Sequence, residues 1–218
     1  MSGLMNFWGQ GDAITRSVAA LLLLMSVSAW VVILWKGWLL KRVRHDIERA
    51  GPAFWAAPTI DAGRDALAAF DRERALGPLL AAAVAAPKGG TLEAKGHVDS
   101  QLTRRLRDAL HGVLAQLQFG QVLLASIGST APFIGLFGTV WGIYHALLGI
   151  SSAGSMTIER VAGPVGEALV MTAAGLAVAI PAVLAYNIFG KMVGSCEAEL
   201  EGFAHDLREM ISDASGPR

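Results

Sequence analysis

Long stretches without a charged side chain dominate the pattern of this chain. No Asp, Glu, Lys or Arg occurs in residues 17–35, in residues 109–158 or in residues 168–190. At about 1.5 Å per residue, the 19 residues of the first stretch form a helix of roughly 29 Å, close to the hydrocarbon thickness of a bilayer. Three such stretches in 218 residues predict an all-α integral membrane protein, with transmembrane helices at 17–35, 122–150 and 161–190.

Helical periodicity continues outside the predicted spans. A stripe of apolar residues at 102–117 has helical spacing and runs into the second span without a strong break, which predicts one long helix through both. A heptad seam in the tail predicts a helix that packs against a partner helix. The seam consists of Val193, Cys196, Leu200, Phe203, Leu207 and Met210. Pro58, Pro78 and residues 87–90 mark predicted turns between short helices.

Basic side chains set the predicted orientation. Arg16 alone precedes the first span, whereas four basic residues follow it within ten positions. Residues 36–120 hold 13 basic and 9 acidic side chains, and an excess of Lys and Arg favours the cytoplasmic side. We therefore expect the cytoplasmic parts to be a helical region at 36–121 and a C-terminal helix at 191–218. The parts expected outside are an N-terminal segment at 1–16 and a short link at 151–160.

Composition excludes several classes of protein. Hydrophobic residues make up 53% of the chain, charged residues 17%, and the formal net charge is zero. This balance disfavours a disordered chain, and it offers no positive field for nucleic acid. The single cysteine, Cys196, excludes an internal disulfide and a multi-cysteine zinc site. Because no nucleotide-binding, metal-binding or nucleophile motif is present, we expect neither an enzyme nor a cofactor or metal.

Two of the predicted spans carry faces of small residues. The faces comprise Gly135, Gly138 and Gly142, with Thr139 beside them, in the second span, and Ala168, Thr172, Gly175 and Ala179 in the third. Such faces let helix backbones approach closely in lipid, and their simplest interpretation is packing between subunits. Pro132 and Pro181 either kink their helices or mark where the packing tightens.

Ionisable side chains inside the predicted spans are candidates for function. Glu167 lies about six residues into the third span, roughly 9 Å deep, where an ionisable group is costly and usually faces a cavity or a partner. The alternative is an interfacial glutamate that water reaches from outside. Thr172 is about 140° from Glu167 around a straight helix, so we expect them to serve different surfaces. His145, near the outer end of the second span, is either part of a proton relay or a packed interface histidine.

Two long motifs point to a family. Residues 128–143 read Gly-Ser-Thr-Ala-Pro-Phe-Ile-Gly-Leu-Phe-Gly-Thr-Val-Trp-Gly-Ile. Residues 166–187 read Gly-Glu-Ala-Leu-Val-Met-Thr-Ala-Ala-Gly-Leu-Ala-Val-Ala-Ile-Pro-Ala-Val-Leu-Ala-Tyr-Asn. Over about residues 122–190 the chain resembles the ExbB/TolQ/MotA proton-channel family, and within it the ExbB group more than the TolQ group. A flagellar-type stator is disfavoured, because that group typically has four spans.

The resemblance implies an assembly and a function. It implies a homopentamer in the bacterial inner membrane whose central pore encloses a dimer of an ExbD-like single-span protein, with membrane lipids around it. The proton motive force then drives motion that a TonB-like protein carries to outer-membrane importers of siderophores and vitamin B12. The outer side of the membrane is accordingly the periplasm. A TolQ-like subunit of the Tol–Pal envelope system and a passive membrane scaffold are the alternatives.

The resemblance also implies roles for single residues. By their positions in the motifs, Thr139 and Thr172 resemble pore-lining threonines, and Glu167 resembles the family's membrane glutamate. Asn187 resembles a polar position at the inner end of the third span. The essential ionisable aspartate is expected on the single-span partner and not on this chain.

Overall fold

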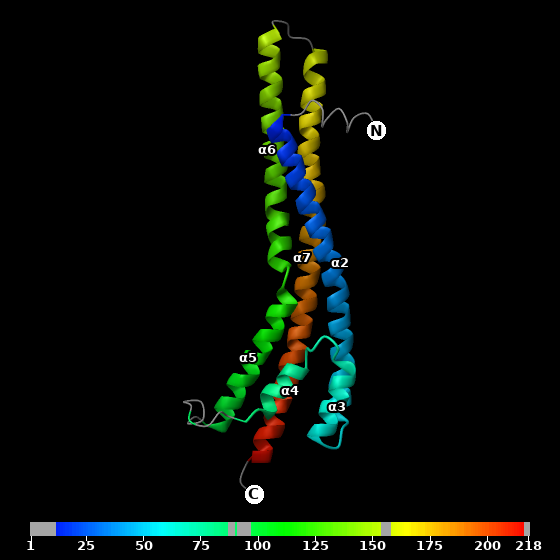
Figure 1. Ribbon diagram of the computed structural model, residues 1–218, viewed down its shortest axis with the longest axis vertical. Helices are drawn as coiled ribbons and strands as arrows, with labels where there is room; N and C mark the ends of the chain where they lie inside the picture. The colour runs from blue at the N-terminus through cyan, green and yellow to red at the C-terminus, as the bar shows by residue number, and fades with distance from the viewer. Residues whose placement is uncertain (1–11, 87–89, 91–96, 154–157, 216–218) are drawn as a thin grey trace. The chain divides into compact units, whose positions relative to one another are not determined.

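The computed structural model describes residues 12–86, 90, 97–153 and 158–215. The elements of this described part are all helices (Figure 1): α2 (Ala13–Trp55), α3 (Ile60–Phe70), α4 (Gly77–Val84), α5 (Val98–Gln118), α6 (Gln121–Ala153) and α7 (Ile158–Ser215). Candidate membrane spans, by length and hydropathy, occur in α2, α6 and α7. For the described part of the chain, the predicted all-α class and the three candidate spans are thereby confirmed.

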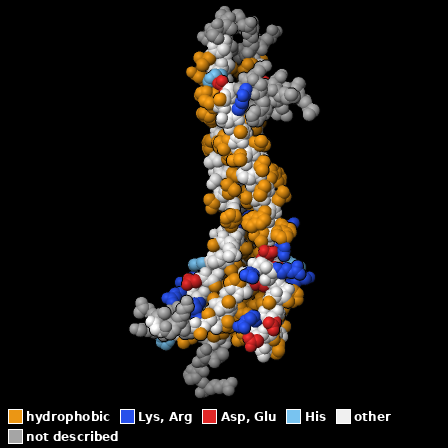
Figure 2. Space-filling view, in the orientation of Figure 1, with side chains coloured by type: hydrophobic (Ala, Val, Ile, Leu, Met, Phe, Trp, Pro, Cys, Tyr) orange, Lys and Arg blue, Asp and Glu red, His pale blue; other side chains and the backbone are white. Residues whose placement is uncertain are grey.

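The chain divides into two compact units, which share α2 and α7. Unit 1 comprises residues 1–35 and 120–188, and unit 2 comprises residues 36–119 and 189–218. On the face shown in Figure 2, hydrophobic side chains, interspersed with backbone and other uncharged side chains, are spread over the described surface of unit 1. Most of the charged side chains visible on that face belong to unit 2.

In unit 1, α6 runs antiparallel to α7 and also contacts α2. A Cβ atom built on Gly128 lies 2.5 Å from the Cγ2 atom of Val183, and one built on Gly142 lies 2.8 Å from the Cβ atom of Ala168. Residue numbers therefore rise along α6 while they fall along α7. The first part of α2 also contacts α6, since a Cβ atom on Gly138 lies 3.1 Å from Val18.

In unit 2, the two apolar stripes predicted from the sequence are buried. All five members of the α5 stripe are buried, namely Leu102, Leu106, Leu110, Val113 and Leu117. Five of the six seam residues of α7 are buried as well, and Met210 is half-buried. The partner helix of the seam is the second part of α2, because the Phe203 ring packs edge-on against Phe54 at a centroid distance of 5.4 Å.

Carboxylates fix the connection between α3 and α4. The Asp71 carboxylate accepts hydrogen bonds from the backbone N–H groups of Ala75, Leu76 and Gly77 at 2.6–3.0 Å. Pro58 lies in the turn between α2 and α3, as predicted. Pro78 instead lies in the first turn of α4, where the missing N–H group of proline has no helical partner to lose.

The prediction of one continuous helix through residues 102–150 is wrong. Helix α5 ends at Gln118 and α6 begins at Gln121. Between them Gly120 adopts a φ of 81°, a left-handed conformation that a residue without a Cβ atom takes up readily. A glycine at the end of an apolar stripe is thus a helix stop here.

The link between the second and third spans, expected at 151–160, is shorter in the structure. Helix α6 extends to Ala153 and α7 begins at Ile158, which leaves residues 154–157 between them. These four residues, residues 1–11 of the expected outer segment and residues 87–89 of the expected turn lie outside the described residues.

Candidate functional site

The small-residue faces of α6 and α7 meet each other inside one chain. A Cβ atom on Gly135 lies 2.6 Å from the backbone oxygen of Met171, and one on Gly175 lies 2.6 Å from the backbone oxygen of Ala131. Real Cβ atoms do not approach backbone this closely, so only glycine fits at these two positions. Within this chain, the faces that the sequence assigned to packing between subunits bring two helices of one subunit together.

The helix crossing places two hydroxyl groups in contact. Thr139 of α6 is buried, and its Oγ1 atom lies 3.1 Å from the backbone oxygen of Ala168 and 3.2 Å from that of Gly135. The Oγ1 atom of Thr172 on α7 contacts the same Thr139 oxygen. When the one hydroxyl hydrogen of Thr139 points to a carbonyl, Thr172 donates to Thr139. Thr172 is half-buried and keeps acceptor capacity for a further group.

Glu167 faces a different neighbour from Thr172. It is an exposed residue that lines a cavity of about 590 Å³ between α2 and α7. The other walls are almost entirely apolar, with Leu22 and Leu23 from α2 and Met171 and Ala174 from α7, and Ser26 of α2 is the polar exception. An acidic side chain at such a cavity is a candidate for interaction with a partner or an ion.

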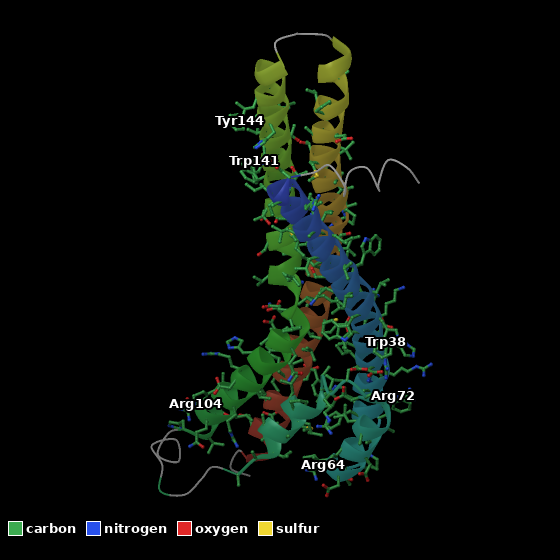
Figure 3. The ribbon with its side chains drawn as sticks, turned by 45° about the horizontal axis from the view of Figure 1, so that its top comes forward. Trp38, Arg64, Arg72, Arg104, Trp141 and Tyr144 are labelled. Carbon is green, nitrogen blue, oxygen red and sulfur yellow. The ribbon has the colours of Figure 1, made fainter. Side chains whose placement is uncertain are left out.

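His145 joins α6 to the residue before α2. Its Nε2 atom lies 3.0 Å from a carboxylate oxygen of Asp12, and its Nδ1 atom lies 3.3 Å from the backbone oxygen of Trp141. The imidazole ring is tilted against the Trp141 ring at a centroid distance of 4.6 Å, and the Tyr144 ring is edge-on to the imidazole. Figure 3 labels Trp141 and Tyr144. The structure therefore places His145 among aromatic rings and beside the Asp12 carboxylate rather than beside the threonine pair.

The remaining candidate residues lie apart from the threonine pair. Asn187 is an exposed residue of α7, and Pro132 and Pro181 lie half-buried inside α6 and α7. Cys196 is buried on the seam, and burial is the main cause that raises the pKa of its thiol. Among the described residues, no group of three or more His, Cys, Asp or Glu is arranged to hold a metal ion.

Two contributors to the site were missed by reasoning from the sequence. The backbone oxygen of Ala168 is a hydrogen-bond partner of Thr139, and the carboxylate of Asp12 pairs with His145. No sequence signal identifies a backbone acceptor on another helix. Asp12 was detectable, because it is an acidic residue close to the start of the first span.

Comparison with known proteins places the chain among transport proteins. The model of the MotA/TolQ/ExbB proton channel family matches residues 71–202. A biopolymer transport protein ExbB of Xanthomonas campestris pv. campestris (strain B100) is 41% identical over 220 aligned positions, which cover 95% of this chain and 86% of that protein. The proteins of the same name from Neisseria meningitidis serogroup B and Salmonella typhimurium (strain LT2) are 38% and 32% identical. The first alignment covers 90% of this chain and 91% of the relative, and the second 90% and 82%.

Proposed function

Because this chain belongs to the MotA/TolQ/ExbB proton channel family, we propose that it is the channel subunit of an ExbB–ExbD–TonB system. It is a multi-pass inner-membrane protein that energises transport. In this proposal it assembles as a homopentamer around the transmembrane helices of an ExbD-like dimer. Proton flow through the assembly drives a TonB-like protein, which powers import of siderophores or vitamin B12 across the outer membrane. This assignment is supported by relatives named biopolymer transport protein ExbB, which align with this chain over most of their length.

The hydroxyl pair at the crossing of α6 and α7 is the observation that carries the proposed mechanism. Thr139 and Thr172 touch each other, and the Thr139 hydroxyl also reaches the backbone of both helices. A hydroxyl group donates and accepts, so it can bond a partner carboxylate or the protonated acid without a fixed charge. In a homopentamer, five copies of a charged side chain around the pore would hold the ion too tightly, whereas conduction requires that the ion be released.

The proposed roles of the other residues follow their surroundings. Glu167 takes part in ion transfer or partner contact at the cavity between α2 and α7, a different surface from that of the threonines. The carboxyl group that gains and loses the proton belongs to the partner and is held opposite Thr172. The basic excess of residues 36–120 supports a cytoplasmic location for that region, with the N-terminus periplasmic and the C-terminus cytoplasmic.

Substitution of the threonines in cells tests this proposal. Thr139→Val and Thr172→Val preserve the side-chain shape and remove the hydroxyl group, so we expect energy-dependent siderophore uptake to fall at least tenfold in assembled variants. Thr130→Val is the matched control, because among the described residues the Thr130 hydroxyl bonds only to the backbone oxygen of Ser126 in its own helix. Normal uptake in both assembled variants would refute the role of the pair. Loss of outer-membrane integrity instead of uptake would assign the chain to a Tol–Pal system.

A further inference from the structure

A completely buried lysine follows the first charge-free stretch. Lys36 is 0% exposed, and among the described residues no carboxylate lies within 4.0 Å of its Nζ atom. The ammonium group instead donates to two backbone oxygens at the end of α5, those of Leu117 and, at 2.7 Å, Phe119. All three residues belong to unit 2.

The end of a helix is a suitable partner for a buried cation. The last carbonyl groups of a helix lack intrahelical partners and carry the negative end of its dipole. Lysine side chains near a C-terminus satisfy such carbonyl groups. Without Lys36, the buried carbonyl group of Leu117 would lose its cationic donor, and an unpaired buried polar group is costly.

Lys36 acts at the residue pair that separates α5 from α6. Phe119 leaves the helical conformation with a ψ of 136°, and Gly120 follows with a φ of 81°. Helix α6, which begins at Gln121, carries Thr139 and the glycines of the crossing. The conformation of residues 119–120 therefore sets where the helix of the proposed ion path begins.

We propose that Lys36 is a positioning residue for ion conduction, which locks the turn between α5 and α6 by binding the carbonyl groups of Leu117 and Phe119. The inference rests on the proposed function, because the path it positions is the threonine pair. The lock itself is a property of this turn and can be measured without any transport assay.

The charge of Lys36 gives the lock a pH dependence. Burial lowers the pKa of Lys36 from 10.5 to about 8 in the closed turn, whereas an opened turn exposes the lysine and restores the higher value. The closed turn thus binds fewer protons than the open turn between pH 8 and 10.5, so it becomes more stable as the pH rises in that window. Linkage predicts that opening becomes roughly five- to tenfold rarer between pH 7.5 and 9.

Hydrogen–deuterium exchange of the assembled protein tests the lock. After correction for intrinsic exchange, we expect amides in the 118–124 segment to exchange at least tenfold faster in Lys36→Met than in wild type. Lys41→Met is the matched control, because Lys41 is an exposed lysine of the same helix. Wild type should show the pH dependence, and Lys36→Met and Lys36→Arg should not. Equal exchange in wild type and Lys36→Met, or an unchanged pH dependence in Lys36→Arg, would overturn the lock.

Proton flux measured on the same samples separates this inference from the proposed function. We expect Lys36→Met to lose flux at least fivefold and Lys36→Arg to restore it at pH 7.5. Faster exchange at the turn with wild-type flux would overturn the positioning role. Should Lys36→Met fail to assemble, the comparison of wild type with Lys36→Arg across pH 7.5–9 decides. If wild type with its single-span partner conducts no protons, the proposed function is wrong, and with it the positioning role, whereas the exchange data still decide the lock.

Discussion

One methyl group added at Gly135 should separate α6 from α7. The new Cβ atom would lie 2.6 Å from the backbone oxygen of Met171 and 3.1 Å from the Cα atom of Gly175. An ordinary carbon–oxygen contact needs about 0.7 Å more, and no side-chain rotation relieves a clash with backbone. Overpacking of this kind costs about 2–3 kcal/mol, so we expect Gly135→Ala to lower the Tm by roughly 4–12 °C.

Thermal unfolding of the purified assembly measures this effect. Gly194→Ala is the matched control, because a Cβ atom there meets nothing within 4 Å and alanine favours the helix by about 0.5–1 kcal/mol. The control should therefore unfold at the same temperature as wild type or slightly higher. The crossing lies one helical turn from Thr139, so Gly135→Ala should also reduce transport. A Tm equal to that of wild type would refute the close-packing argument.

Three further predictions concern unit 2. Phe203→Ala should destabilise the protein by about 3–5 kcal/mol in an unfolding assay, because the buried ring packs against Phe54 and Trp55. Phe70→Ala, at an exposed position, should cost less than about 1 kcal/mol in the same assay. Asp71→Ala should lower the free energy of unfolding by about 2–3 kcal/mol, because three backbone N–H groups lose a charged acceptor. Asp65→Ala, at an exposed position, is the control, and equal stabilities of the two variants would contradict the role of the Asp71 carboxylate in this connection. Cys196 should react with maleimide at pH 7.5 at least tenfold more slowly than the cysteine of a Ser195→Cys/Cys196→Ser variant, whose position 195 is exposed. Burial both shields the Cys196 thiol and raises its pKa, and equal rates would contradict this burial.

Periodicity explains why much of the architecture could be predicted. The α5 stripe and the α7 seam are buried as their spacing requires, because a helix of 3.6 residues per turn aligns those positions on one face. The charge-free stretches predicted three spans for a different but equally local reason, because a candidate span requires only sufficient length and hydropathy. These features depend on local sequence alone.

Features that depend on contacts between distant residues could not be predicted. The glycine faces indicated close packing, but their spacing does not reveal whether the neighbour is another subunit or another helix of the same chain. The break at Gly120 was missed because the apolar pattern continues across it, and the donor that locks it, Lys36, is 81 residues from Leu117. Lys36 is one of the four basic residues that follow the first charge-free stretch, and nothing in the sequence distinguishes its complete burial from the exposure of Lys41.

Proton flux in liposomes tests the central claim most directly. The purified chain, reconstituted with its single-span partner under an imposed pH gradient, should conduct protons, and either component alone should not. Flux should fall at least tenfold in Thr139→Val and Thr172→Val, whereas Thr130→Val should conduct like wild type. Wild-type flux in the Thr139→Val/Thr172→Val double variant would contradict the account.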